Sequence, residues 1–173
     1  IPIAVDEWNV WYRATPDARD AAFNGLEDTY DLADALVVAM HLNAFIRHAP
    51  FVRMANIAQL VNVIAPMVTT PDGLLLQTTF HPFELYSRTC GDVALGATWS
   101  SDTFSAGDHT GVRLLEVAAS LDERARRVSV YIVNRDADGP REVAVDFADA
   151  RPRSDVEVHV ISGRDGDLRA AFG

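Results

Sequence analysis

The acidic residues Asp6 and Glu7 follow a short apolar run, 3–5, and precede a segment rich in aromatic residues, 8–12. A carboxylate can act as a nucleophile, while tryptophan and tyrosine rings offer flat faces to a sugar and NH or OH groups to its hydroxyls. These residue types predict a carbohydrate site in which Glu7 attacks the sugar. The alternative is structural: the two carboxylates cap a strand-to-loop junction or form salt bridges there, and the tryptophans belong to the core.

The apolar run that precedes the carboxylates has the composition of a buried parallel strand, and chemistry in such folds collects at the carboxyl ends of strands. A helix with Asp31 as its N-cap is predicted next, and it ends before Pro50. A second strand is predicted over 52–61. Because strand, helix and strand follow one another as in a parallel crossover, we expect Glu7 and Gln59 at the same edge.

The periodicity of the sequence changes near Gly91. Just before it, the stretch from Pro82 to Cys90 predicts a short helix. From Val93 onward, apolar residues recur at every second position, as in strands that bury one face. Strands are expected at 128–133, 143–147 and 156–160, and turns at 107–111, 136–140, 151–153 and 163–166. This pattern is typical of an antiparallel sandwich.

Three segments, 6–12, 34–39 and 54–66, closely resemble the second half of the intracellular α-L-arabinofuranosidases of glycoside hydrolase family 51. The resemblance implies a mixed fold of α/β and all-β parts. Residues 1–91 would be the C-terminal portion of a (β/α)8 TIM barrel that carries the catalytic site. Residues 92–173 would form an antiparallel, jelly-roll-like β-sandwich domain that is truncated at its end.

By this resemblance, Glu7 corresponds to the catalytic nucleophile of a retaining glycosidase, and Trp11 and Gln59 line the arabinofuranose site. Asn56 and Asn62 match the family pattern too, and we interpret them as structural because side-chain amides often satisfy backbone groups. The family's acid/base glutamate belongs to a region that this sequence does not contain. We therefore expect a fragment that carries the nucleophile and has no turnover alone, from an enzyme that removes terminal non-reducing α-L-arabinofuranosyl groups from arabinan or arabinoxylan oligosaccharides.

Asp6 is the rival for the role of nucleophile. Adjacent strand residues point to opposite faces, so Asp6 and Glu7 are not expected to enter one pocket together. The sequence departs from the family at two places. The loop over 13–27, which would contact the substrate, is short and has Phe23 where a tryptophan is frequent in the family. Near the end of the barrel part, His81 stands where relatives often have an aromatic residue.

Composition narrows the possible partners. Fifteen basic and 25 acidic residues give a formal charge of −10, which disfavours nucleic acid and anionic membranes. The single cysteine, Cys90, cannot form an internal disulfide, and the five histidines lack the spacing of a zinc site. We expect no metal or other cofactor, no membrane-spanning segment, a cytoplasmic location, and a homo-oligomer for the full-length enzyme that binds its arabinofuranosyl substrate.

Two other classes of function stay open at this stage. In the first, the sandwich is a noncatalytic carbohydrate-binding module, with Trp99, Phe104 and Tyr131 as the candidate sugar-contacting aromatics. In the second, the chain has an assembly role and Glu7 is a relic. An upstream segment that ends a barrel strand with Asn-Glu would favour the enzyme.

Overall fold

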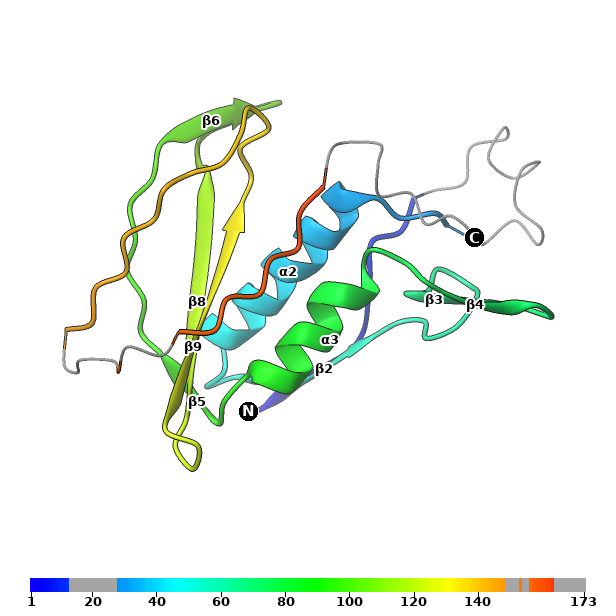
Figure 1. Cartoon of the computed structure of the whole chain (residues 1–173), viewed down its shortest axis with the longest axis horizontal. Helices are drawn as coiled ribbons and strands as arrows, with labels where there is room; N and C mark the ends of the chain where they lie inside the picture. Colours follow the sequence, from blue (N-terminus) through cyan, green and yellow to red (C-terminus); the bar gives the residue numbers. More distant parts are fainter. Residues whose placement is uncertain (13–27, 149–152, 154–155, 164–173) are drawn as a thin grey trace.

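The computed structural model describes residues 1–12, 28–148, 153 and 156–163. The predicted loop over 13–27, Phe23, and parts of the turns predicted at 151–153 and 163–166 lie outside the described residues. Two helices and nine strands follow one another along the described chain (Figure 1). In order they are β1 (Ile3–Trp8), α2 (Leu32–Arg47), β2 (Val52–Ile57), β3 (Met67–Thr70), β4 (Gly73–Leu76), α3 (Phe80–Thr89), β5 (Val93–Leu95), β6 (Thr103–Ala106), β7 (His109–Arg113), β8 (Leu115–Asp122) and β9 (Arg127–Asn134).

Helix α2 begins at the predicted cap. The Asp31 carboxylate accepts hydrogen bonds from the backbone N–H groups of Ala33 and Asp34, at 2.8 and 3.3 Å, and the Asp34 carboxylate accepts from the Asp31 N–H at 2.8 Å. This reciprocal capping box satisfies N–H groups that a helix start leaves free. At the other end, the His48 N–H donates to Ala44 O at 3.0 Å, and Pro50 follows.

Strands β1 and β2 pair in parallel, as the strand-helix-strand pattern predicts. The prediction that the second strand reaches 61 is wrong, because β2 ends at Ile57. Ala58 still bonds to the partner strand, but the Gln59 N–H turns away and donates to Ile64 O at 3.2 Å. Gln59 therefore lies in the loop over 58–66 that joins β2 to β3, and not within a strand.

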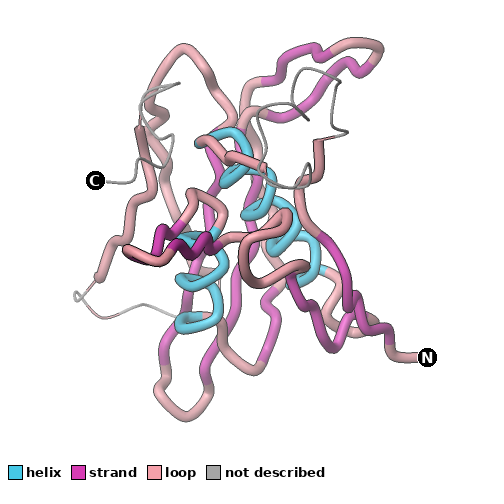
Figure 2. Tube along the Cα trace, turned by 90° about the vertical axis from the view of Figure 1, so that its right-hand side faces the viewer, coloured by secondary structure: helices cyan, strands magenta, loops and turns pink. Residues whose placement is uncertain are grey.

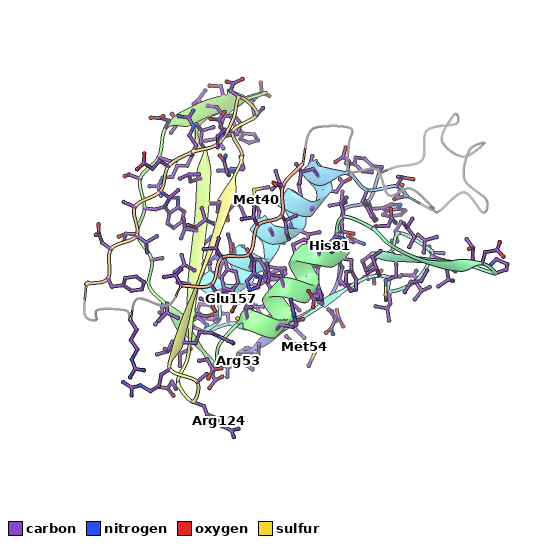
Figure 3. The ribbon with its side chains drawn as sticks, in the orientation of Figure 1. Met40, Arg53, Met54, His81, Arg124 and Glu157 are labelled. Carbon is purple, nitrogen blue, oxygen red and sulfur yellow. The ribbon has the colours of Figure 1, made fainter. Side chains whose placement is uncertain are left out.

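Helix α2 lies between α3 and the antiparallel sheet of β5, β8 and β9 (Figure 1). The main buried cluster joins Ala39 of α2 and Tyr86 of α3 to Ala118, Tyr131 and Val133 of the sheet. Met40, labelled in Figure 3, packs against this cluster from α2. The core thus contains residues from both sides of position 91, and the division into domains at 91/92 stays a prediction.

The all-β part differs from the prediction in extent. The strand expected at 128–133 is confirmed within β9. The turn predicted at 107–111 is shorter than expected: residues 107 and 108 join β6 to β7, with Gly107 at φ +56°, and residues 109–111 belong to β7. The strands expected at 143–147 and 156–160 are wrong, because the structure has no strand over either segment. Their alternating valines are exposed, by 73 to 76% at 156, 158 and 160. An alternating pattern supplies one apolar face, but a strand also needs a hydrogen-bonding neighbour.

Helix α3 starts at Phe80, before the predicted Pro82, and ends at Thr89, just ahead of Gly91. Proline is tolerated in the first turn because the N–H groups there have no partner within the helix. A side chain could not replace the hydrogen at Gly91, since a Cβ atom would lie 2.1 Å from the backbone carbon of Leu121. The hairpin of β3 and β4 projects from the body of the molecule in Figure 1 and points toward the viewer in Figure 2.

Candidate active site

Glu7 lies at an irregularity near the carboxyl end of β1. From the pair Val5↔Ala55 to the pair Trp8↔Ile57, the chain advances by three residues in β1 and by two in β2. Strand β1 therefore contains one extra residue there. Such a bulge re-aims side chains and is frequent beside active sites. Strict alternation does not apply across it, so the argument that separated Asp6 from Glu7 by opposite faces does not hold here. Both side chains are exposed.

One backbone contact places Glu7 and Gln59 on adjoining segments. The Ala58 N–H donates to the Trp8 carbonyl at 3.0 Å. Since Glu7 directly precedes Trp8 and Gln59 directly follows Ala58, the two predicted site residues flank this bond on neighbouring segments. Gln59 is exposed. The expectation that both residues lie at the same edge of the parallel pair agrees with this contact, although Gln59 comes from a loop.

Trp11 lies beyond the end of β1 with 63% of its surface exposed. The residues on either side of it are tethered to the segment that enters α2. The Tyr30 hydroxyl donates to Val10 O at 2.8 Å, and the Tyr12 hydroxyl donates to the Asp34 carboxylate. Trp11 therefore offers an exposed indole on a backbone that is fixed on both sides.

Trp8 anchors the strand end to the helices. Its ring stacks on His41 at a centroid distance of 5.5 Å and meets Phe45 edge-on at 5.1 Å, both from α2, while Phe83 of α3 lies 6.1 Å away. The His41 Nδ1 atom lies 2.8 Å from Val37 O, which fixes the imidazole ring that the indole contacts. The aromatic residue next to Glu7 thus belongs to the packing between layers.

Gln77 is a supporting residue that the sequence did not reveal. It is 2% exposed, and its Nε2 group donates to Ala65 O at 2.8 Å and to Asp28 O at 3.0 Å, while its Oε1 atom accepts from the Tyr30 N–H at 3.0 Å. It thereby joins the loop that carries Gln59 to the segment that holds Trp11. A glutamine after an apolar strand has no sequence signature, because its role depends on segments far apart in the chain.

The start of α2 is the most perturbed electrostatic region near the site. Burial raises the pKa of Asp34 above its ordinary value, although the bond from Tyr12 opposes this effect. The same hydrogen bond raises the pKa of Tyr12 to about 12. Burial also raises the pKa of Asp28 and of Tyr30. These groups therefore favour their neutral forms more than they would in water.

The aromatics considered for a binding module do not form an exposed platform. Tyr131 is only 6% exposed. Trp99 donates its Nε1–H to Leu115 O at 2.9 Å, and its ring lies 5.6 Å from the Arg47 guanidinium and 5.1 Å from that of Arg113. Phe104 is half-buried beneath a guanidinium at 5.7 Å. These rings serve packing between elements.

Within the described residues, no group of three or more His, Cys, Asp or Glu side chains is arranged to hold a metal ion. No helix in the described ranges is both long enough and apolar enough to cross a membrane.

Residues 6–172 match the family model described as the alpha-L-arabinofuranosidase C-terminal domain. The chain belongs to this family. Its α-L-arabinofuranosidase relatives include a protein of Streptomyces lividans named intracellular exo-alpha-(1->5)-L-arabinofuranosidase, which is 37% identical over 98% of this chain. Alpha-L-arabinofuranosidase C of Emericella nidulans is 36% identical over 93% of the chain. The resemblance to family 51 stated from the sequence is thereby confirmed.

Solved α-L-arabinofuranosidase structures share this arrangement of elements. The family 51 enzyme AbfB of Bifidobacterium longum matches 79% of the chain with a TM-score of 0.68 at 34% identity. The Thermotoga maritima enzyme, solved as an arabinose complex, matches 77% with a TM-score of 0.65 at 30% identity. The mixed sheets with few helices are consistent with the β-sandwich C-terminal domain of such enzymes.

This α-L-arabinofuranosidase domain spans roughly a quarter to a third of the length of its relatives. It covers 26% of the Streptomyces protein, 32% of the Emericella protein and 28% of the Bifidobacterium structure. The named activities therefore belong to proteins in which this region is the C-terminal part.

Proposed function

We propose that this chain supplies the nucleophile of a retaining α-L-arabinofuranosidase and that Glu7 is that nucleophile. The contact that carries the proposal is the hydrogen bond from the Ala58 N–H to the Trp8 carbonyl, which sets Glu7 and Gln59 on adjoining segments. A bulge at Glu7, exposed carboxylate and amide groups, and an exposed indole at Trp11 support it. Together they supply a nucleophile, a hydrogen-bonding amide and a flat apolar face for one furanose ring.

The chemistry would be a double displacement. Glu7 would attack the anomeric carbon while a second carboxyl group, about 5 Å away in retaining enzymes, protonates the departing oxygen. That group would then activate water, which releases the arabinose from its ester with Glu7. In this proposal the second carboxyl group comes from outside residues 1–173, and the chain alone does not turn over substrate.

The proposed catalytic part is residues 1–91, as the C-terminal portion of a (β/α)8 barrel, with residues 92–173 as the sandwich domain. The parallel pairing of β1 and β2 around α2 supports this division. Ile3 and Met54 are 50% and 56% exposed on the two paired strands. Met54 points away from α3 in Figure 3. Parallel strands are normally covered on both faces, so such exposure is expected of two strands from a larger sheet.

The proposed substrate is a terminal, non-reducing α-L-arabinofuranosyl group on an oligosaccharide from arabinan or arabinoxylan. The linkage is left open, because relatives are named for both (1->5) and (1->6) bonds. We also propose a cytoplasmic location, which the word intracellular in the names of the Streptomyces and Halalkalibacterium relatives supports. Assembly of the full-length enzyme into a homo-oligomer is a further part of this proposal.

The test is to trap the ester intermediate. The full-length protein that carries this sequence would be treated with a 2-fluoro-arabinofuranoside that forms the ester quickly and loses it slowly, and then digested and mapped by mass spectrometry. We expect one sugar adduct on Glu7 and none in a Glu7→Gln variant. An adduct on Asp6, or on any other residue, would overturn the assignment.

A further inference from the structure

One carbonyl oxygen connects the strand of Glu7 to the loop of Gln59. Ile64 O accepts a hydrogen bond from the Asn9 side-chain Nδ2 group at 2.6 Å and another from the Gln59 backbone N–H at 3.2 Å. The first donor lies just beyond the end of β1, and the second belongs to the proposed sugar-binding residue. The Gln59 backbone and the segment after Glu7 therefore share one acceptor.

The orientation of the Asn9 amide is fixed from both ends. Its Oδ1 atom accepts from the Val10 N–H at 2.8 Å, so its Nδ2 group must be the one that faces Ile64 O. A carbonyl oxygen can accept only from a donor, which gives the same orientation. A flipped amide would place oxygen against oxygen and lose both bonds. Asn9 can therefore make this bridge in one orientation only.

The acceptor is held by a strained backbone. Ile64 has φ +41°, a region that β-branched residues rarely adopt and that persists only where the surroundings fix it. The next residues supply that constraint: Ala65 is fully buried and its carbonyl accepts from the Gln77 side chain, and Pro66 O accepts from the Gln77 N–H at 2.8 Å. The buried Gln77 thus holds the two residues that directly follow the Ile64 carbonyl.

We infer that Asn9 is a positioning residue for Gln59. It acts without touching the sugar, by holding the loop over 58–66 against the end of β1 through Ile64 O. This inference rests on the proposed function, because it takes Glu7 as the nucleophile and Gln59 as a sugar ligand. Its specific content is that Asn9 contributes to catalysis only through Gln59.

A double-mutant cycle in the full-length protein tests this content. The value of kcat/KM for an aryl α-L-arabinofuranoside would be measured for the wild type, Asn9→Ala, Gln59→Ala and the double variant. We expect Asn9→Ala to lower kcat/KM about tenfold when Gln59 is present and less than about twofold when it is absent, since residues that act through one another are not additive. A residue that only stabilises the fold would give the same factor in both backgrounds, and that result would overturn the inference.

The cycle also separates the two proposals. If Gln59→Ala leaves kcat/KM unchanged, the proposed role of Gln59 fails and the inference fails with it. If Gln59→Ala is impaired but the two effects multiply independently, only the inference fails. If Asn9→Ala and Asn9→Ser both fail to accumulate as folded protein, Asn9 is a determinant of the fold, and the inference is rejected as well.

Asn62 provides a matched control on the same loop. Its Oδ1 atom accepts from the Thr69 N–H at 2.7 Å and from the Thr69 hydroxyl at 3.2 Å, so among the described residues only the oxygen of this amide is used. Asn62→Asp keeps that acceptor, whereas Asn9→Asp replaces the Nδ2 donor by an oxygen that faces Ile64 O. With the same added charge in each, we expect Asn9→Asp to lose at least about tenfold in kcat/KM and Asn62→Asp less than about threefold. Equal losses would show that charge, and not the bridge, is responsible.

Discussion

The rings of Tyr86 and Tyr131 are stacked, with centroids 4.1 Å apart and an interplanar angle of 25°. Tyr86 belongs to α3 and Tyr131 to β9, and the Tyr86 hydroxyl also donates to Asn43 Oδ1 of α2 at 2.8 Å. One aromatic pair therefore joins the helices next to the candidate site to the antiparallel sheet. Loss of packing in the sheet should therefore destabilise the helices that support Trp8.

Replacement of Tyr131 by alanine should lower the free energy of unfolding by about 3 to 5 kcal/mol, because it removes a buried aromatic ring and leaves a cavity. Ile132→Ala on the same strand is the control, since Ile132 is 39% exposed and Tyr131 only 6%. We expect the control to cost about 1 kcal/mol or less. Urea denaturation followed by circular dichroism measures both, and similar losses would contradict the packing described here.

Glu7→Ala should abolish hydrolysis of an aryl α-L-arabinofuranoside by the full-length protein, because no nucleophile remains to form the ester. Added azide should partly restore release of the aryl group, since a small anion can occupy the vacated volume and attack the sugar. The product would be an arabinofuranosyl azide, which chromatography detects. Asp6→Ala should yield no such azide product, and activity retained by Glu7→Ala would reject the assignment.

Gln59→Ala should reduce kcat/KM by a factor that corresponds to about 1 to 3 kcal/mol, the cost of leaving one buried sugar hydroxyl without its partner. Leu60→Ala is the neighbouring control, because Leu60 is 60% exposed and offers no polar group to a substrate. Steady-state kinetics of the full-length protein measures both variants. If the two changes have equal effects, Gln59 is a scaffold residue of the loop.

The buried carboxylate of Asp34 should make stability depend on pH in a defined direction. Its pKa is raised by burial above the ordinary value of 3.8, so the folded state holds this proton more tightly than the unfolded state. The resulting stabilisation is complete below pH 3.8 and is lost as pH rises through the raised pKa. Relative to the wild type, Asp34→Asn should therefore gain stability as pH increases across that window.

Asp136 is the control, because its pKa is shifted in the opposite direction from that of Asp34. The hydrogen bond from the Asp138 N–H, together with Arg141, holds the pKa of Asp136 below its ordinary value. Its contribution is present above pH 3.8 and is lost as pH falls through the lowered pKa. Asp136→Asn should therefore lose stability relative to the wild type as pH rises over this range. Chemical denaturation at a series of pH values measures both, and parallel curves for the two variants would contradict these environments.

The sequence by itself determined the local elements and the family. Helix α2 follows from its apolar spacing, from Asp31 as its N-cap and from Pro50 beyond its end, all of which act within a few residues. The first of the two paired strands follows from the short apolar run over 3–5. The segments over 6–12, 34–39 and 54–66, which include Glu7 and Gln59, together indicated family 51.

Only the tertiary structure decided where the strands stop and what fixes the site. The end of β2 at Ile57, the bulge at Glu7 and the bridge through Ile64 O depend on hydrogen-bond partners far away in the chain, which local periodicity does not encode. The alternating valines over 143–147 and 156–160 show the same limit, because alternation gives a strand an apolar face but only a neighbouring segment can pair its backbone. Gln77 likewise acquires its role from three separate segments that folding brings to one buried side chain.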